Sequence, residues 1–485
     1  MAQPDGRLKG ALDYLDSHLA HFQDQLVALS RIAGVSAERA PSQALRRSAA
    51  AMAGVMREAG VENVEVLEIE GVHPYVYGDW LRKPGAPTIL LYGHHDVQPE
   101  GRPEKWLSPP YEPVVRNGRL FGRGTADDKA GCMTHVAAVA SYLKSGGELP
   151  LNVRFVIEGE EEIGSENLGR FLKTFRDRLD ADFIVLSDTA NFDTGVPALT
   201  YQLRGICTVD LEVQGLERPV HSGMWGGPVP DTVQLACQII AGLQGKDGRL
   251  DVPGLYSQVA KTGKAQLARM RKLPFSEAKF KREAGLMKGM TLAGEKGYSV
   301  YEQLWTRPAL TVIAFEARPI EGSSNQIIDS VRARLSLRTV PDMDPRAAGR
   351  ALVKKLTARP PFGVKVTARV VGTTPWWTTD PEGPAFEAAR RALQKGYGKP
   401  TAMIGAGGSI GFVGPFAELL GGAPCLLMGV EDPHCNAHSE NESLDLGDFV
   451  KSMRSAIYLY DELSRVETKR RRSGSSREPR RPLRR

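Results

Sequence analysis

The sequence has few cysteines and no long apolar run, and each shortage excludes a class of protein. Five cysteines occur among 485 residues and none forms a Cys-x-x-Cys pair, so neither a disulfide framework nor a structural zinc knuckle is expected. No apolar stretch reaches about 18 residues, the length that suggests a transmembrane helix. The segment 1–10 is polar and lacks the apolar core of a secretory signal, so we expect a cytoplasmic protein with no membrane partner.

Positive charge is scarce outside one terminal segment. The formal net charge is +6, but residues 469–485 contain nine Lys or Arg and one Glu, which leaves −2 for the rest of the chain. A nucleic-acid-binding body needs a basic surface, so that function is not expected. The segment 468–485 has almost no apolar residues and is predicted to be a disordered basic tail. The only contact with nucleic acid that we expect is a weak one made by this tail.

The sequence does contain a regular alternation of apolar strands and helical segments. Strands are predicted at 64–69, 88–92, 151–158 and 182–187, and helices at 11–34, 45–59, 130–143 and from about 167. This order is typical of an α/β domain with a mostly parallel sheet. The same pattern returns late in the chain, with a helix at 384–395, a strand at 424–430 and a helix at 446–466.

The pattern between about residues 205 and 374 is different. Segments 208–213 and 331–338 alternate apolar and polar residues, as half-exposed strands do, and 231–245 has helical spacing. We therefore predict an inserted α+β domain. The predicted organisation is a catalytic domain in two parts, an insert between them and a basic tail, with bounds 1–204, 205–374, 375–467 and 468–485.

Ionisable residues follow the predicted strands directly. His94 and Asp96 follow one strand, Glu160–Glu162 follow the next, and Asp188 follows a third. Ligands of open α/β sheets bind at the carboxyl ends of the strands, so these side chains are expected to lie together.

Two further residues complete a candidate ligand set. Asp127 follows the glycine-rich run 122–126, and His438 lies in a polar segment near the end of the chain. Two divalent ions held close together require several His or carboxylate ligands and usually a bridging carboxylate. The combined set is therefore the pattern that a two-metal hydrolase needs.

The motifs around these residues are similar to those of the M20 metallopeptidases, in the same order, from about residue 12 to 466. The matching runs are Gly93-His94-x-Asp96-Val97-Gln98-Pro99, Gly122-Arg123-Gly124-Thr125-Ala126-Asp127-Asp128-Lys129, Glu158-Gly159-Glu160-Glu161-Glu162-Ile163-Gly164-Ser165, Leu186-Ser187-Asp188, His221-Ser222-Gly223 with Gly226-Gly227, and Ala437-His438-Ser439-x-Asn441-Glu442. The run Tyr201-x-Leu203-Arg204-Gly205-Ile206-Cys207 is most similar to the cytosolic non-specific dipeptidase and carnosinase branch. The resemblance implies a dipeptidase in which the insert is a lid and dimerisation domain.

The resemblance also implies which residues bind metal. Asp127 would bridge two ions, His94 and Asp188 would bind one of them, and Glu162 and His438 would bind the other. Zinc is the expected metal, with manganese or cobalt as alternatives, because all three accept such ligands.

Glu161 is the implied general base, which takes a proton from water and passes it to the leaving amine. Asp96 is the implied residue that holds the imidazole of His94 in its ligating tautomer. Three successive glutamates leave a choice of register, and Ile163-Gly164-Ser165 fixes it against the family's acid-acid-x-Gly-Ser pattern. His95 departs from the family pattern, but its side chain should point away from that of His94.

Four residues of and near the insert match family positions that contact substrate. They are His221, Asn325, Arg338 and Ser409. The resemblance implies that His221 reaches the carbonyl oxygen of the scissile bond across a homodimer interface, and the Arg338 fork suits a substrate carboxylate. Ile328 stands where the family often has Pro, so the loop near Asn325 departs from the pattern.

Three functions remain open at this point. The first is hydrolysis of a small peptide such as a dipeptide. The second keeps the metal motifs but changes the substrate, as in deacylases or desuccinylases of N-acyl amino acids and in carboxypeptidases. The third is a non-catalytic binding protein, which the intact set of ligands and the presence of Glu161 disfavour.

Overall fold

The computed structural model describes residues 6–37 and 42–468, and the chain divides into two compact units. The first unit consists of Met1–Thr200, Asp380–Ala402 and Pro415–Arg485, and the second of Tyr201–Thr379 and Met403–Gly414. The late segment 403–414 joins the second unit, whereas the sequence placed it in the second part of the catalytic domain. Apart from Thr468, the predicted tail lies outside the described residues.

The first unit contains a sheet with the strand order β1-β2-β6-β3-β7-β17-β8. The bounds are β1 Glu62–Leu67, β2 Tyr75–Trp80, β3 Thr88–His94, β6 Asn152–Glu158, β7 Phe183–Ala190, β8 Ala198–Leu203 and β17 Cys425–Glu431. The central strands β6, β3, β7 and β17 are parallel, which confirms the predicted α/β class. The strands on either side pair antiparallel, which the sequence did not indicate.

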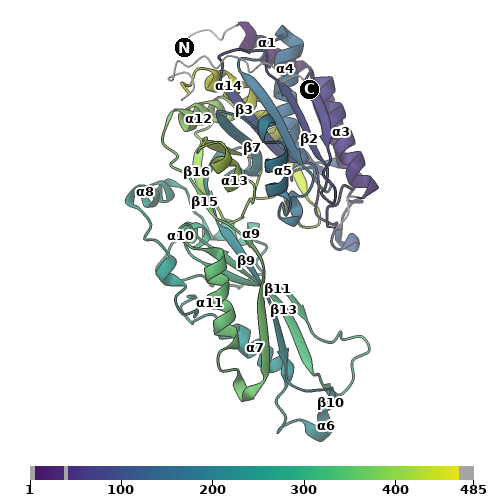
Figure 1. The fold of residues 1–485 in the computed structure, drawn as a ribbon, viewed down its shortest axis with the longest axis vertical. Helices are drawn as coiled ribbons and strands as arrows, with labels where there is room; N and C mark the ends of the chain where they lie inside the picture. The colour runs from purple at the N-terminus through teal and green to yellow at the C-terminus, as the bar shows by residue number, and fades with distance from the viewer. Residues whose placement is uncertain (1–5, 38–41, 469–485) are drawn as a thin grey trace, which may run out of the picture. The chain divides into compact units, whose positions relative to one another are not determined.

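Helices surround this sheet. They are α1 Gly6–Ser17, α2 Leu19–Ser30, α3 Gln43–Ala59, α4 Lys129–Gly146, α5 Leu168–Thr174, α12 Pro384–Tyr397, α13 Val413–Leu419 and α14 Leu446–Ser464, with 3-10 turns η1 Pro103–Lys105, η2 Glu161–Ile163 and η3 Arg176–Arg178. Helix α4 is buried on nearly all sides and contacts α1, α3 and α14, so helices from both ends of the chain pack together (Figure 1).

The first predicted helix, 11–34, is in fact two helices that meet at His18. The Ser17 hydroxyl donates to the carbonyl oxygens of Asp13 and Tyr14 at 3.0 and 2.9 Å, and His18 Nδ1 contacts the Tyr14 oxygen at 2.9 Å. These side-chain bonds compete with the backbone pattern of a continuous helix, which apolar spacing alone does not report.

A small three-stranded sheet joins the late polar segment to the glycine-rich run. It contains β4 Val114–Arg116, β5 Arg119–Phe121 and β18 Ser443–Asp445, and β18 pairs with β5 through Ser443 and Phe121. Residues that are more than three hundred positions apart in the sequence thereby become neighbours, and Asp127 and His438 flank this junction.

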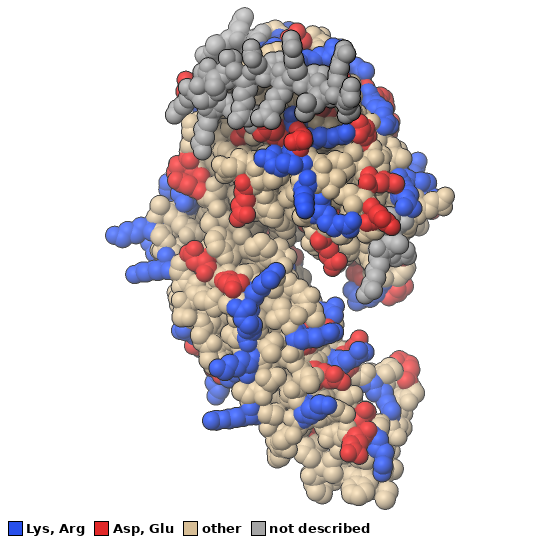
Figure 2. Space-filling view, in the orientation of Figure 1, with Lys and Arg blue, Asp and Glu red and all other residues tan. Residues whose placement is uncertain are grey.

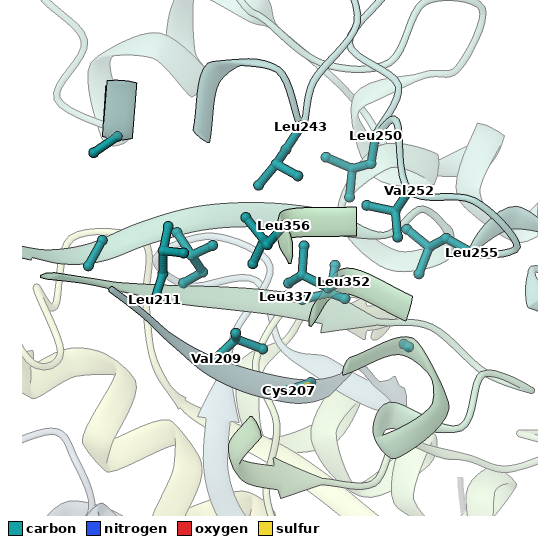
Figure 3. Close-up of a cluster of buried hydrophobic side chains, with 14 of the residues drawn as sticks. Cys207, Val209, Leu211, Leu243, Leu250, Val252, Leu255, Leu337, Leu352 and Leu356 are labelled. Carbon is teal, nitrogen blue, oxygen red and sulfur yellow. The ribbon is translucent and has the colours of Figure 1, made fainter. Parts of the chain in front are cut away.

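The second unit is built on an antiparallel sheet with the order β11-β13-β9-β14. Its strands are β9 Gly205–Gln214, β11 Ala309–Glu316, β13 Ser330–Thr339 and β14 Lys365–Thr374. Two helices, α7 Thr232–Ala241 and α11 Pro345–Thr357, pack on this sheet. Figure 3 shows the core of the unit, in which Leu337 of the sheet lies close to Leu352 and Leu356 of α11.

Shorter elements complete the second unit. They are β10 Val220–His221, α6 Ser222–Trp225, η4 Tyr256–Gln258, α8 Lys264–Lys272, α9 Glu277–Glu283, α10 Val300–Thr306, β12 Gln326–Ile327, η5 Pro361–Gly363, β15 Trp377–Thr378 and β16 Ala402–Ala406. Three of these short helices, α8, α9 and α10, lie in the segment 257–306.

The surface of the protein carries charges of both signs, and its cysteines are unpaired. On the face drawn in Figure 2, Lys and Arg are interspersed with Asp and Glu. All five cysteines are free thiols, and four of them are buried. Within residues 6–37 and 42–468, none of the helices combines the length and the apolar character that crossing a membrane requires.

Candidate metal centre

Five side chains of the first unit form two clusters that share Asp127. One cluster is His94, Asp127 and Asp188, the other is Asp127, Glu162 and His438, and within each the candidate ligand atoms lie within 4.8 Å of one another. Asp127 Oδ1 is 3.0 Å from His94 Nε2, and Asp127 Oδ2 is 3.0 Å from His438 Nε2. Each oxygen of one carboxylate therefore faces a different cluster, which is the arrangement that a bridging ligand needs.

The parallel strands bring three of these residues together. His94 is the last residue of β3, and Asp188 lies near the end of the neighbouring strand β7, with 3.8 Å between His94 Nε2 and Asp188 Oδ1. Glu158, which ends β6, pairs with His94, and the chain then turns into η2 with Glu161 and Glu162. The carboxyl edge of the sheet thus holds the acids that the strand ends predicted.

His438 comes from a loop whose start is anchored by one ion pair. Arg119 donates two hydrogen bonds to Asp432 at 2.7 and 2.8 Å, which fixes the start of the loop. His438 has a φ of 63°, and its Nε2 is 3.1 Å from Glu162 Oε2. Its side chain is 59% exposed, in contrast to the other four candidate ligands, so this side of the pair of clusters is the accessible one.

Glu442 fixes the loop that carries Asp127. Its carboxylate accepts hydrogen bonds from the backbone N–H groups of Gly124, Ala126 and Asp127 at 3.0 to 3.1 Å, and from Arg123 Nη1 at 2.8 Å. Arg123 is 1% exposed, so loss of the Glu442 charge would leave a buried guanidinium unpaired, at a cost of about 3–5 kcal/mol. Glu442 ends the last matched motif, and that position was its only signal in the sequence.

The backbone around Asp96 sets the orientation of His94. His94 Nδ1 is 3.1 Å from the Asp96 carbonyl oxygen and 3.4 Å from its carboxylate, so the carbonyl is the nearer acceptor. A proton on Nδ1 leaves Nε2 free to bind a cation. The Asp96 carboxylate instead accepts the N–H groups of Glu161 and Glu162 at 3.3 and 3.1 Å. The predicted control of the tautomer by the Asp96 side chain stays a prediction.

Other polar neighbours hold the glutamates in place. Gln98 donates from its backbone and side chain to the two carboxylate oxygens of Glu162 at 3.2 and 2.8 Å. Glu160 is fully buried and accepts hydrogen bonds from Tyr75 and Asn167. Glu160 is occupied in this way and Glu162 belongs to one cluster, so Glu161, which interacts electrostatically with Asp188 and Asp127, is the remaining glutamate of the triplet.

Crowded buried acids give the centre an excess of negative charge. Burial raises the pKa of Glu161 and Asp188, and the carboxylates around them raise it further. Hydrogen bonds with Asp127 and Glu162 raise the pKa of His438 to about 11. Burial opposes protonation of His94, but its contacts with Asp127, Asp188 and Asp96 still raise its pKa well above the usual range. A donor set of this composition fits divalent cations, which would supply the missing positive charge.

Two further acids lie near the centre and were given no role from the sequence, although Asp128 belongs to a matched run. Asp128 Oδ2 accepts the N–H of His94 at 3.1 Å. Glu431 ends β17, and burial together with Asp127 and Asp188 raises its pKa. The signal for Glu431 was available, since it directly follows the predicted strand 424–430 in the same way that Asp188 follows its own strand.

The substrate residues predicted in the second unit form two separate pairs. Ser222 N donates to the Asn325 carbonyl oxygen at 2.9 Å, and β10 pairs with β12, so His221 and Asn325 lie together. Arg338 Nη1 donates to Ser409 Oγ at 2.9 Å. The stretch of β13 from Ser330, five residues after Asn325, to Arg338 spans roughly 26 Å at about 3.3 Å per residue. Figure 1 shows β10 and α6 at one end of this sheet.

Comparison with known proteins agrees with these motifs. The family model described as Peptidase family M20/M25/M40 matches residues 90–462. The Cysteinylglycine-S-conjugate dipeptidase of Corynebacterium striatum is 34% identical over 362 residues, which are 74% of this chain and 77% of that protein. The structure of the dipeptidase Dug1p of Saccharomyces cerevisiae superposes with a TM-score of 0.84 at 26% identity, over 95% of this chain and 99% of that one. Human carnosine dipeptidase 1 gives 0.84 at 25% identity, over 96% and 100%.

Proposed function

The chain belongs to peptidase family M20/M25/M40 and is a metallodipeptidase of that family, and we propose that its catalytic centre is the pair of clusters joined by Asp127. One observation supports this assignment most strongly. The two carboxylate oxygens of Asp127 lie 3.0 Å from Nε2 of His94 and 3.0 Å from Nε2 of His438, respectively. His94 and Asp188 would hold one ion, and Glu162 and His438 the other. Zinc fits these ligands, as do manganese and cobalt.

Bound cations would supply Lewis acidity, which makes a water molecule more acidic and polarises the scissile carbonyl. The remaining steps belong to side chains of this chain. Glu161 takes the proton of the attacking water and delivers it to the leaving amine. Asp96 positions Glu161 and Glu162 together, because one carboxylate accepts both of their backbone N–H groups.

Four residues of the second unit are proposed to recognise the substrate. Arg338 presents a planar fork that binds a carboxylate through two parallel hydrogen bonds, and Ser409 orients it. His221 and Asn325 would contact the scissile carbonyl oxygen. His221 is exposed, and the described hydrogen bond of its side chain is from Gly223 N to Nδ1 at 3.1 Å, so this contact uses only one of its ring nitrogens.

The distance of roughly 26 Å along β13 means that one chain cannot bring both pairs to a single dipeptide. We propose that a second copy supplies His221 and Asn325 in a homodimer formed through the inserted domain. The edge strand β11 supports this proposal, because Val312, Ile313 and Phe315 are 41%, 56% and 41% exposed on it. Exposed apolar edges of this kind commonly pair with another chain.

Dimerisation can be tested with a charge on this edge. We expect a species of twice the chain mass of 52.9 kDa in sedimentation equilibrium, and Ile313→Lys should shift it toward the monomer. Activity should fall by about 10²-fold, the usual effect of losing one transition-state donor. Leu107→Lys, at an exposed apolar residue of the first unit, is the matched control and should stay dimeric. A fully active monomer with His221 intact contradicts the proposal.

A substrate panel tests the proposed specificity. Purified protein loaded separately with zinc, manganese or cobalt should hydrolyse dipeptides with kcat/KM at least about tenfold above that for N-acyl amino acids, because the similar proteins are dipeptidases. Release of amino acids is followed by chromatography. The reverse preference would assign a deacylase or desuccinylase function, and no hydrolysis with any metal would leave a binding protein.

The five free thiols support the proposed cytoplasmic location.

A further inference from the structure

Two arginines of the second unit are withdrawn from solvent without an acidic partner. Arg204 follows β8 and is 8% exposed; its Nε donates to the Gly407 carbonyl oxygen at 3.0 Å. Arg338 is half-buried and bonds to Ser409, whose hydroxyl in turn donates to the Arg204 carbonyl oxygen. Among the described residues, neither guanidinium has an ion pair with a carboxylate.

The charge of Arg204 persists despite its burial. Burial and the nearby positive charge of Arg338 lower the pKa of Arg204 to about 10, which still leaves it protonated at neutral pH. A buried charge is costly unless a partner compensates it. Arg307, which borders the same cavity as Arg204, shows the compensated case, since it donates to both oxygens of Glu295 at 2.8 and 2.6 Å. Arg204 and Arg338 lack such a partner. An anion from outside the chain would therefore neutralise their positive charges.

Arg204 also lines a cavity of about 300 Å³ inside the second unit. Much of the remaining wall is apolar and includes Leu250, Phe280, Val300, Leu304 and Leu310. Arg338 is not part of this wall, but its register partner Ala309 is, and Ser409 links the Arg338 guanidinium to the backbone of Arg204.

The glycine at position 407 leaves room for the guanidinium group of Arg204. A side chain at Gly407 would place its first carbon 2.9 Å from Arg204 Nη2, so glycine at this position lets the group keep its place. A volume of this size accepts one small side chain rather than a peptide. The ligand that fits is thus a small molecule with a carboxylate at one end and an apolar group beside it.

We propose that Arg204 and Arg338 bind one carboxylate together and that the cavity beside Arg204 receives an apolar group of the same ligand. If the proposed dipeptidase function holds, this ligand is the C-terminal residue of the dipeptide, and Arg204 is a specificity residue in addition to Arg338. The enzyme then prefers dipeptides with a free carboxyl end and an apolar second side chain.

Binding can be measured without catalysis. Calorimetry with the metal-loaded full chain should show that 4-methylpentanoate binds and that its amide, 4-methylpentanamide, binds at least about tenfold more weakly. Arg204→Gln should weaken binding of the acid by about 10–100-fold, because a charge-assisted contact is lost. Arg334→Gln, on an exposed arginine of the same sheet that is paired with Asp210, is the matched control and should change binding less than twofold. Equal binding by Arg204→Gln and the unaltered protein overturns the proposal.

A milder variant keeps the test valid if Arg204→Gln does not fold. Arg204→Lys retains the charge but loses the planar fork, and it should weaken binding of 4-methylpentanoate by about threefold to tenfold. Melting temperature and metal content establish that each variant is folded and loaded. Unchanged binding in a folded Arg204→Lys protein overturns the role of the fork.

Kinetics then identify the bound group. With Ala-Leu as substrate, Arg204→Gln should raise KM about tenfold or more and change kcat less than about threefold, as expected when binding energy is lost equally in ground and transition states. Leu304→Trp, which fills the cavity, should lower kcat/KM for Ala-Leu about tenfold but not for Ala-Gly. Equal effects on both substrates overturn the role of the cavity. Absence of any dipeptide hydrolysis would refute the proposed function, while the calorimetry still decides the role of Arg204.

Discussion

Replacing Glu161 with glutamine should lower kcat for dipeptide hydrolysis by about 10²- to 10⁴-fold, the usual contribution of a general base. Glutamine has the size of glutamate but cannot take a proton from water. The two clusters retain all five of their candidate ligands in this variant, so metal content should stay at two ions per chain. Stopped assays with Ala-Leu, together with elemental analysis of the same sample, measure both quantities.

The neighbouring glutamates supply the comparison. Glu166→Gln changes an exposed acid five residues away and should leave kcat within about twofold. Glu160→Gln removes a charge that Tyr75 and Asn167 hold in the interior, so its main effect should be on the melting temperature. Unchanged turnover in Glu161→Gln would refute the assignment of the base, and a large loss of kcat in a stable Glu160→Gln protein would move it by one residue.

Replacing Asp127 with asparagine should remove both ions, whereas replacing His438 with alanine should remove one. The reason is that both oxygens of Asp127 are used, one toward His94 and one toward His438. Loss of Lewis acidity is worth several kcal/mol, so kcat/KM should fall by about 10³-fold or more in Asp127→Asn. Chelation of the unaltered enzyme should have the same effect, and added zinc, manganese or cobalt should reverse it.

Metal counts after gel filtration in metal-free buffer decide this prediction. Asp177→Asn, at an exposed acid of the same unit, is the control and should keep two ions. An Asp127→Asn protein that retains two ions is incompatible with a bridging carboxylate. A His438→Ala protein that loses both would mean that the two clusters do not bind independently.

The sequence predicted the site best where a residue type that can bind metal directly follows an apolar strand. His94 and Asp188 follow apolar strands, and parallel pairing of neighbouring strands then brings such residues to one edge without further information. Asp127 and His438 could be linked to that edge only through the matched motifs, because what joins them is a small sheet between segments far apart in the chain.

Features that depend on distant partners were not predictable. Gln98 holds Glu162, and Glu442 holds the loop of Asp127. Both lie in matched runs, but neither their type nor their spacing indicates which group they hold. The antiparallel sides of the sheet and the segment 403–414 depend on pairing across the fold. The helix break at His18 is local, but it arises from side-chain hydrogen bonds that apolar periodicity does not contain.

The length of β13 has a kinetic consequence under the dimer proposal. Because His221 pairs with β12, which precedes the start of β13, while Arg338 lies near the end of β13, a single chain carries two half-sites and each complete site draws on two chains. Specific activity then depends on the enzyme's own concentration, and it declines on dilution below the dissociation constant of the dimer. A mixture of two inactive variants, one altered at His221 and the other at Arg338, would regain part of the activity, because some mixed dimers contain one intact site.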